Sequence, residues 1–151
     1  MTQKKIRVAV VGYGISARVF HLPFFTTTLT DQFELVAILQ RSGDEAEKAH
    51  PGIKIYRDLD SLLRNADIDL VVITTPNDTH FPFAQRALEA GKHVVLEKPF
   101  TNTTEEAAQL VNLTKASGKI LSVYQNRRYV SDFRAIKDIL DKKLLGEVHE
   151  F

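Results

Sequence analysis

The sequence predicts an α/β fold in which helices cover both faces of a doubly wound parallel sheet, and three observations indicate it. Short apolar runs alternate along the chain with longer segments of helical periodicity. The runs Val8–Val11 and Val71–Ile73 are continuously apolar, which is typical of strands buried on both faces of a parallel sheet. A glycine-containing turn follows the first run directly. With 151 residues, 44% of them hydrophobic, the chain is long enough for one domain with a full core.

The alternation gives an ordered set of expected elements. Thr103 and Glu106 form a capping box, and Gly91 and Gly118 follow two expected helices where a left-handed cap residue is favoured. Helices are expected at roughly 14–29, 43–50, 58–65, 79–90 and 103–117. Strands are expected at Ile6–Val11, Phe33–Leu39, Ile53–Tyr56, Asp69–Thr74, His93–Leu96 and Ile120–Tyr124. This succession predicts a sheet with the strand order 3-2-1-4-5-6.

The last part of the chain has a different pattern. An amphipathic helix is expected from Ser131 to about Lys143, and Gly146 then introduces a turn before the alternating segment Glu147–Phe151. A strand without a neighbour leaves its backbone donors and acceptors unpaired. We therefore expect residues 1–130 to form a complete first domain. Residues 131–151 are expected to be the connecting helix and first strand of a second α/β domain; a short frayed terminus is the alternative.

The charge balance excludes some classes of partner. Twenty basic residues stand against 19 acidic ones, so no nucleic-acid or anionic-membrane partner is expected. The chain has no cysteine, which excludes disulfides and thiolate metal sites, and no His, Asp or Glu spacing gives His80 metal-binding partners. The apolar stretch near the N-terminus is too short for a membrane span and lacks a signal-peptide cleavage region. We expect a cytoplasmic protein without a metal.

The segment Gly12-Tyr13-Gly14-Ile15-Ser16-Ala17 follows the first strand and opens the first helix. This is the GxGxxA form of the dinucleotide-binding fingerprint of the Rossmann fold. Gly12 permits the tight turn, Gly14 lets the pyrophosphate approach the backbone, and Ala17 lets the helix pack closely on the sheet. The phosphates are expected at the helix N-terminus, whose free N–H groups and dipole favour negative charge. An ordinary strand–helix turn is the alternative.

The end of the second strand indicates which dinucleotide binds. Domains that bind NAD place an acidic residue there, which holds the ribose 2′-hydroxyl. Here Leu39–Ser42 contains no carboxylate, and Asp31 precedes the strand, at the wrong edge of the sheet. Arg41 is suited to pair with a 2′-phosphate, and Ser42 is suited to donate a hydrogen bond to it. We predict NADP as the cofactor; NAD, with Arg41 as a solvated loop residue, is the alternative.

Two further clusters follow the fourth and fifth strands. Thr74-Thr75-Pro76-Asn77 and His80 lie at the expected switch point of the sheet, where ligands of such folds bind, although Asp78 or Thr79 also suits a helix cap. The fifth strand leads into Glu97-Lys98-Pro99, which places a lysine at the mouth of the cleft. A lysine beside a nicotinamide suits proton exchange with a substrate hydroxyl.

These motifs together resemble the Gfo/Idh/MocA family of oxidoreductases, and the resemblance covers essentially the whole chain. It implies hydride transfer between the cofactor and a sugar, polyol or related carbonyl substrate. It also implies that Lys98 is the catalytic or proton-relay lysine and that Glu97 lies near the nicotinamide ribose. The other residues that it places around the cofactor are Thr74, Pro76, Asn77, His80, Gln125, Asn126 and Arg127.

The resemblance carries three more expectations. The Lys98–Pro99 bond is often cis in family members, which directs the lysine into the cleft. The family has a second α/β domain that supplies an Asp/His pair and most of the substrate pocket, and we expect a homo-oligomer formed through that domain. Without it, the 151-residue chain is expected to bind cofactor but not to turn over substrate. A non-catalytic nucleotide sensor is the alternative, although a sensor needs no proton-relay lysine.

Overall fold

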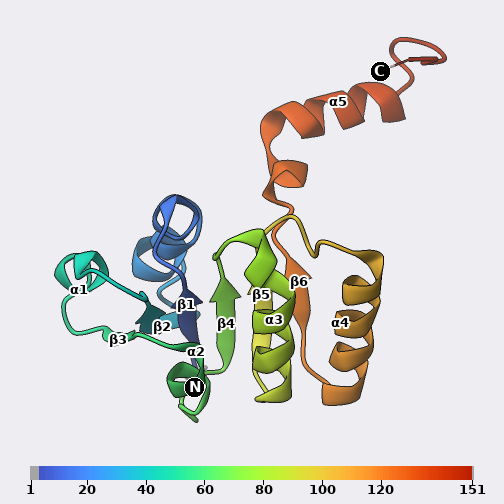
Figure 1. Ribbon diagram of the computed structural model, residues 1–151. Coiled ribbons are helices and arrows are strands. Elements are labelled where there is room, and N and C mark those ends of the chain that lie inside the picture. The colour runs from blue at the N-terminus through green and yellow to red at the C-terminus, as the bar shows by residue number, and fades with distance from the viewer. Residues whose placement is uncertain (1–3, 151) are drawn as a thin grey trace.

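A parallel sheet of six strands forms the centre of the computed structural model, which describes residues 4–150 (Figure 1). The strands lie in the order β3-β2-β1-β4-β5-β6, so the predicted doubly wound topology is confirmed. The order reverses between β1 and β4, which makes their carboxyl ends the switch point of the sheet. The bounds are β1 (Ile6–Val11), β2 (Phe33–Leu39), β3 (Lys54–Tyr56), β4 (Leu70–Ile73), β5 (His93–Leu96) and β6 (Leu121–Val123).

The helices between the strands follow the predicted order. The capping box of Thr103 and Glu106 is present, and Gly118 ends its helix in the left-handed conformation, as expected. Two short 3-10 turns, η3 (Asn77–Thr79) and η4 (Asn126–Tyr129), follow β4 and β6. The α-helices are α1 (Glu45–Ala49), α2 (Leu59–Leu63), α3 (His80–Glu89), α4 (Thr104–Ser117) and α5 (Ser131–Asp141).

The first helix differs from the expected α-helix over 14–29. It contains two π-helical segments, η1 (Ala17–His21) and η2 (Phe24–Thr28), which meet at Leu22 and Pro23. Proline has no backbone N–H and cannot donate within a helix. The hydroxyl of Thr27 also donates to the carbonyl of Pro23 over 2.6 Å, which competes with the regular backbone pattern. Both features lie where η2 begins, whereas η1 ends before Pro23.

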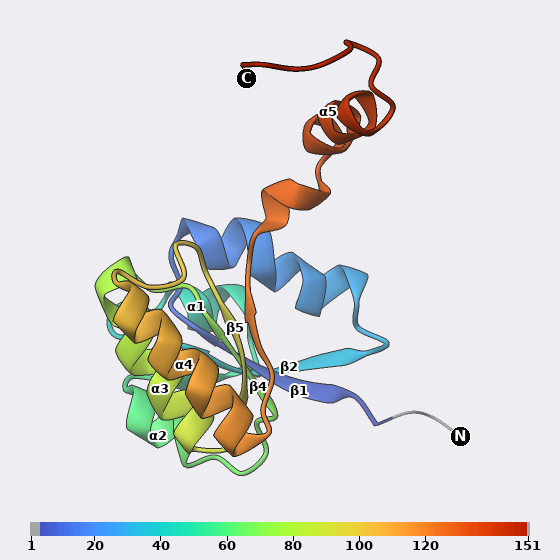
Figure 2. The ribbon, with the colours of Figure 1, turned by 90° about the vertical axis from the view of Figure 1, so that its right-hand side faces the viewer.

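Alternate residues of the strands pack into two apolar layers. Val8 and Val10 contact one layer, which includes Ala17 of η1 and Ala46 of α1. The neighbouring positions of β1 belong to the other layer, which is covered by α2, α3 and α4 (Figure 2). All four residues Val8–Val11 are fully buried, which explains why the run is continuously apolar.

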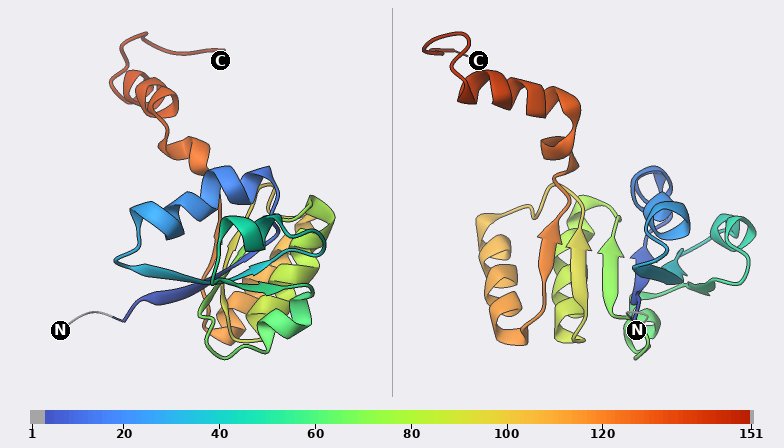
Figure 3. Two further views of the ribbon diagram at one scale, coloured as in Figure 1. Left: turned by 90° about the vertical axis from the view of Figure 1, so that its left-hand side faces the viewer. Right: turned by 180° about the vertical axis from the view of Figure 1, so that it is seen from behind.

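Helix α5 projects beyond the carboxyl edge of the sheet, as both views in Figure 3 show. Its apolar side chains Phe133, Ile136 and Leu140 are exposed. Residues 147–150, which were expected to begin a strand, have no regular secondary structure, and Phe151 lies outside the described residues. Within residues 4–150 no strand pairs with this segment, so its backbone has no ladder to join. Over the same range, no helix is both long and apolar enough to cross a bilayer.

Candidate functional site

The carboxyl ends of β1, β4 and β5 surround a cavity of about 560 Å³ at the switch point of the sheet. This volume lies within the range of about 300–1,000 Å³ that is typical of small-molecule sites. The cavity brings together residues that are up to 112 positions apart in the sequence. Its lining consists of Ile15, Ser16, Phe20, Thr74, Thr75, Asn77, His80, Glu97, Lys98, Asn126 and Arg127.

Gly12 forms the turn that leaves β1. Its φ of 101° lies in the region that side chains disfavour. A Cβ atom at this position would lie 2.9 Å from Oγ1 of Thr74 and 3.1 Å from Cγ2 of Thr75. The Thr74 hydroxyl in turn donates to the carbonyl of Val11 over 3.0 Å. Gly12 is therefore required both by the turn and by its close packing on the segment after β4.

Replacing Gly12 with alanine is expected to lower the free energy of unfolding by roughly 2–3 kcal/mol, because left-handed strain and the lost Thr74 hydrogen bond add together. Urea unfolding followed by circular dichroism measures the change. Gly118→Ala is the matched control: Gly118 also has a positive φ, of 65°, but no atom lies within 4 Å of its would-be Cβ. Equal losses in the two variants would show that packing against Thr74 contributes nothing.

Gly14 differs from Gly12 in its surroundings. No atom lies within 4 Å of the position that its Cβ would occupy, and the neighbouring Ile15 is 68% exposed. Ala17, by contrast, is fully buried in the apolar layer beneath the helix. The turn thus leaves open space above Gly14 and packs tightly at Ala17. This arrangement suits a pyrophosphate resting on the open N-terminus of the coil.

Glu97, directly after β5, is buried and has three donors. Its Oε1 atom accepts a hydrogen bond from the Ser16 hydroxyl and lies 2.9 Å from Nε2 of His21, while Oε2 accepts from the backbone N–H of Lys98 over 3.0 Å. Burial raises the pKa of Glu97, but the hydrogen bonds from Ser16, His21 and Lys98 outweigh burial and leave that pKa below its ordinary value. The carboxylate is therefore held in its ionised form.

Lys98 is exposed at the mouth of the same cavity, and the Lys98–Pro99 bond is cis, as the resemblance predicted. His80 also lines this cavity, and its side chain is buried, with 1% exposed. Its ring nitrogens lie 2.7 Å from the carbonyl oxygen of Pro99 and 3.0 Å from that of Thr75. His80 therefore joins the segment after β4 to the segment that carries Lys98, with both nitrogens engaged by backbone.

The loop after β2 lies on the other side of β1 from Lys98. Arg41 and Ser42 are both exposed on it. The guanidinium of Arg57 donates to the carbonyls of Gln40, over 3.0 Å, and Gly43, over 2.7 Å. No local sequence pattern indicates this contact, because Arg57 and Gln40 are 17 positions apart. Arg57 fixes the backbone on either side of Arg41 and Ser42 and so presents their side chains outward.

Three further predicted residues, Tyr13, Pro76 and Gln125, do not line this cavity. Pro76 is exposed in the segment after β4, and Gln125 is exposed in the segment after β6, but neither lines the cavity. Tyr13 lies beside His50, with ring centroids 5.8 Å apart. Within residues 4–150, no three His, Asp or Glu side chains gather in a way that would hold a metal ion.

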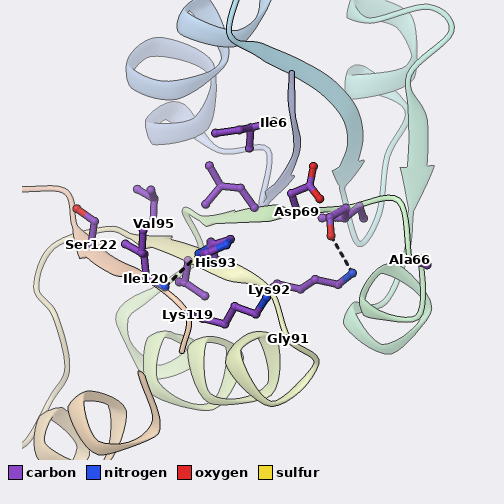
Figure 4. Close-up of a pocket in the computed structure, with 13 residues that line it drawn as sticks. Ile6, Ala66, Asp69, Gly91, Lys92, His93, Val95, Lys119, Ile120 and Ser122 are labelled. Carbon is purple, nitrogen blue, oxygen red and sulfur yellow. Dashed lines mark hydrogen bonds between the residues drawn. The ribbon is translucent and has the colours of Figure 1, made fainter. Parts of the chain in front are cut away.

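A second cavity, of about 540 Å³, lies at the opposite, amino-terminal edge of the sheet (Figure 4). Its buried Lys92 donates to the carbonyls of Asn65, over 2.9 Å, and Ile68, over 2.8 Å, and burial lowers the pKa of Lys92. Nδ1 of His93 accepts a hydrogen bond from the backbone of Ile120. The polar groups of Lys92 and His93 are thus already hydrogen-bonded to neighbouring segments of the fold. The cavity at the carboxyl edge is the better candidate for a ligand.

Residues 6–125 match the family model of Gfo/Idh/MocA, described as an oxidoreductase family with an NAD-binding Rossmann fold. The chain belongs to this family. The match includes the fingerprint turn, the segment after β4 and the Glu97-Lys98-Pro99 segment, so the predicted family and fold are both confirmed.

Members of the Gfo/Idh/MocA family resemble this chain over nearly its full length. The chain is 45% identical to the uncharacterized oxidoreductase C115.03 of Schizosaccharomyces pombe, covering 97% of this chain and 40% of that protein. It is 34% identical to the scyllo-inositol 2-dehydrogenase (NADP(+)) IolW of Bacillus subtilis, with the same two coverages. An oxidoreductase from Bacillus cereus superposes with a TM-score of 0.84 at 34% identity, covering 95% of this chain and 41% of that one.

The chain thus spans about 40% of the length of these curated relatives. The family is described as oxidoreductases with an NAD-binding Rossmann fold, and the name of the Bacillus subtilis relative specifies NADP(+).

Proposed function

We propose that this chain is the NADP-binding part of a cytoplasmic oxidoreductase that transfers hydride between the nicotinamide and a sugar, polyol or related carbonyl. One observation carries the proposal: the open space above Gly14 and the exposed Lys98 border the same switch-point edge of the sheet. Residues 1–130 form the cofactor domain, and residues 131–151 lead into a second domain that holds substrate and forms a homo-oligomer.

The residues of the site suit the parts of a dinucleotide. The N–H groups at Gly14 to Ser16 bind the pyrophosphate, and Arg41 with Ser42 binds the 2′-phosphate. The segment after β4, together with Asn126 and Arg127, contacts the cofactor along the cavity. When bound, the nicotinamide supplies the hydride acceptor or donor. Lys98 then exchanges a proton with the substrate hydroxyl, whose proton must leave as the carbonyl forms.

The wild-type chain is expected to bind NADPH about tenfold or more tightly than NADH, because a charge-assisted contact to the 2′-phosphate contributes about 1.5–3 kcal/mol. Replacing Arg41 with alanine is expected to remove most of that preference while leaving NADH affinity unchanged. Fluorescence titration with each cofactor measures both affinities. Arg134→Ala is the control, because it removes the same charge from exposed helix α5.

Three results would contradict the NADP proposal or the role of Arg41 in it. Equal affinities of the wild-type chain for NADPH and NADH would favour NAD as the cofactor. An unchanged preference in Arg41→Ala would assign the recognition of the 2′-phosphate to other residues. Loss of NADPH affinity in Arg134→Ala as large as in Arg41→Ala would point to a general effect of charge.

A further inference from the structure

Glu97 lies at the centre of a hydrogen-bond network that joins two segments of the fold, the coil after β1 and the end of β5. Ser16 and His21 approach one of its carboxylate oxygens from the coil after β1, and the backbone of Lys98 approaches the other from the end of β5. Ser16 and Glu97 are 81 positions apart, and His21 and Glu97 are 76 apart. The phosphate-binding turn is thereby linked directly to the strand that carries the lysine.

His21 is placed by its own contacts. Its side chain is 3% exposed, and its ring packs on that of Tyr124 with centroids 4.2 Å apart. The hydroxyl of Tyr124 donates to the carbonyl of Phe20 over 3.1 Å, which ties the segment after β6 to the same coil. The imidazole therefore has little freedom to move away from Glu97. Ser16 and Glu97 both line the cavity at the carboxyl edge of the sheet, so the network borders the proposed cofactor site.

A carboxylate accepts about four hydrogen bonds in total, and three are accounted for by Ser16, His21 and Lys98. The remaining capacity is on Oε2, which also faces the backbone of Lys98. This capacity is open to a donor in the cavity, which Glu97 lines, while the network holds the other oxygen. The position and charge of Glu97 thus depend on Ser16 and His21.

We propose that His21 and Ser16 are positioning residues, which keep Glu97 ionised and in place and so align the phosphate-binding turn with Lys98. The inference rests on the proposed binding of a nicotinamide dinucleotide at this site. It assigns a role to His21, which lies outside both the GxGxxA fingerprint and the Glu-Lys-Pro segment.

The groups around Glu97 determine how the proposal is tested. The titratable groups that face it are His21 from η1, Tyr124 after β6 and the adjacent Lys98. Burial raises the pKa of Glu97 and the hydrogen bonds lower it, with a net decrease from the ordinary 4.5. Without the donor on His21, fewer hydrogen bonds oppose the effect of burial, so the pKa of Glu97 rises. The carboxyl group then takes up a proton at a pH where the wild-type group stays charged.

The test compares His21→Leu, which removes the donor, with His21→Gln, whose amide nitrogen can occupy the place of Nε2. NADP⁺, which is stable in acid, is titrated into the 151-residue chain at pH 8 and at pH 5. The ratio of variant to wild-type dissociation constants is the readout, because it removes the cofactor's own titration. We expect this ratio to rise about tenfold between pH 8 and pH 5 for His21→Leu and to stay nearly constant for His21→Gln.

A second pair of variants, at Ser16, tests the network independently in case the His21 variants do not fold. Ser16→Ala removes the other donor at a half-buried site, and Ser16→Thr keeps the hydroxyl. The same contrast in pH dependence is expected between these two. A loss of affinity that is equal at both pH values in both members of each pair would reduce the network to a structural role and overturn the proposal.

Thermal unfolding without cofactor separates this proposal from the proposed function. A carboxyl group with a lowered pKa stabilises the fold above its unfolded pKa, and this stabilisation is lost as the pH falls through the folded value. The stability lost in His21→Leu should therefore be largest at pH 7 and shrink towards pH 4, whereas His21→Gln should follow the wild type. A wild-type chain that binds no NADP⁺ overturns the proposed function, and a pH-independent loss in His21→Leu overturns the network's role.

Discussion

Replacing Gly14 with valine is expected to weaken NADPH binding by about a hundredfold or more while leaving the stability of the chain almost unchanged. No protein atom lies within 4 Å of the would-be Cβ, so the fold accommodates the side chain. The added methyl groups occupy the space proposed for the pyrophosphate. Keeping the phosphates off the backbone removes at least two charge-assisted hydrogen bonds, of about 1.5–3 kcal/mol each. Titration calorimetry and thermal unfolding measure the two quantities on the same sample.

Gly14→Ala is expected to have a smaller effect than Gly14→Val, because a methyl group occupies less of the proposed pyrophosphate space than an isopropyl group. We expect an intermediate loss of affinity and an unfolding temperature equal to or slightly above that of the wild type, since alanine restricts the unfolded chain. Wild-type affinity in Gly14→Val would place the pyrophosphate elsewhere. A large fall in unfolding temperature would show that the turn, rather than the cofactor, requires this glycine.

The 151-residue chain is expected to bind NADPH without oxidising or reducing sugars or polyols at a measurable rate. Lys98 is exposed. Within residues 4–150, the other acid and histidine side chains that line its cavity, Glu97 and His80, are buried, so no exposed acid or histidine is present there to hold a substrate. Positioning of a substrate against a cofactor contributes roughly 7–11 kcal/mol to catalysis. A site open to water also loses the electrostatic advantage of an enclosed one. The expected rate is therefore several orders of magnitude below that of an assembled enzyme.

Absorbance at 340 nm, with NADP⁺ and a panel of inositols and hexoses, measures this rate directly. Mass spectrometry of the same sample must show the 151-residue chain without longer protein, and cofactor titration must show that the site is occupied. A full-length inositol dehydrogenase serves as the positive control. Robust turnover by the chain alone would contradict the proposal that substrate is held by a second domain.

Local sequence was sufficient for the elements that position the site. Continuous apolar runs such as Val8–Val11 identified strands that are buried on both faces, because a parallel sheet covered by helices leaves no polar side. Gly12 and Gly14 identified the turn after β1, since both glycines are separated by one residue at the end of such a run. These signals lie within a few residues of one another and need no knowledge of distant contacts.

Boundaries and terminal segments were less well predicted for identifiable reasons. The helical periodicity over 14–29 did not reveal the π-helical geometry, because periodicity indicates which side chains share a face and not which carbonyl each backbone N–H reaches. The alternating pattern of Glu147–Phe151 predicted a strand, whereas residues 147–150 form none. An alternating pattern indicates only which side chains share a face. A strand also needs a second strand beside it to accept and donate its backbone hydrogen bonds.

By itself, the sequence determined the fold class, the strand order, the family and most of the residues around the cavity. Only the tertiary structure placed His21 and Ser16 on Glu97 and brought Arg57 to the loop that carries Arg41. A histidine in an apolar coil has the same local pattern as one that only fills the core. Its role depends on a carboxylate 76 positions away, which the closing of the sheet brings within 2.9 Å.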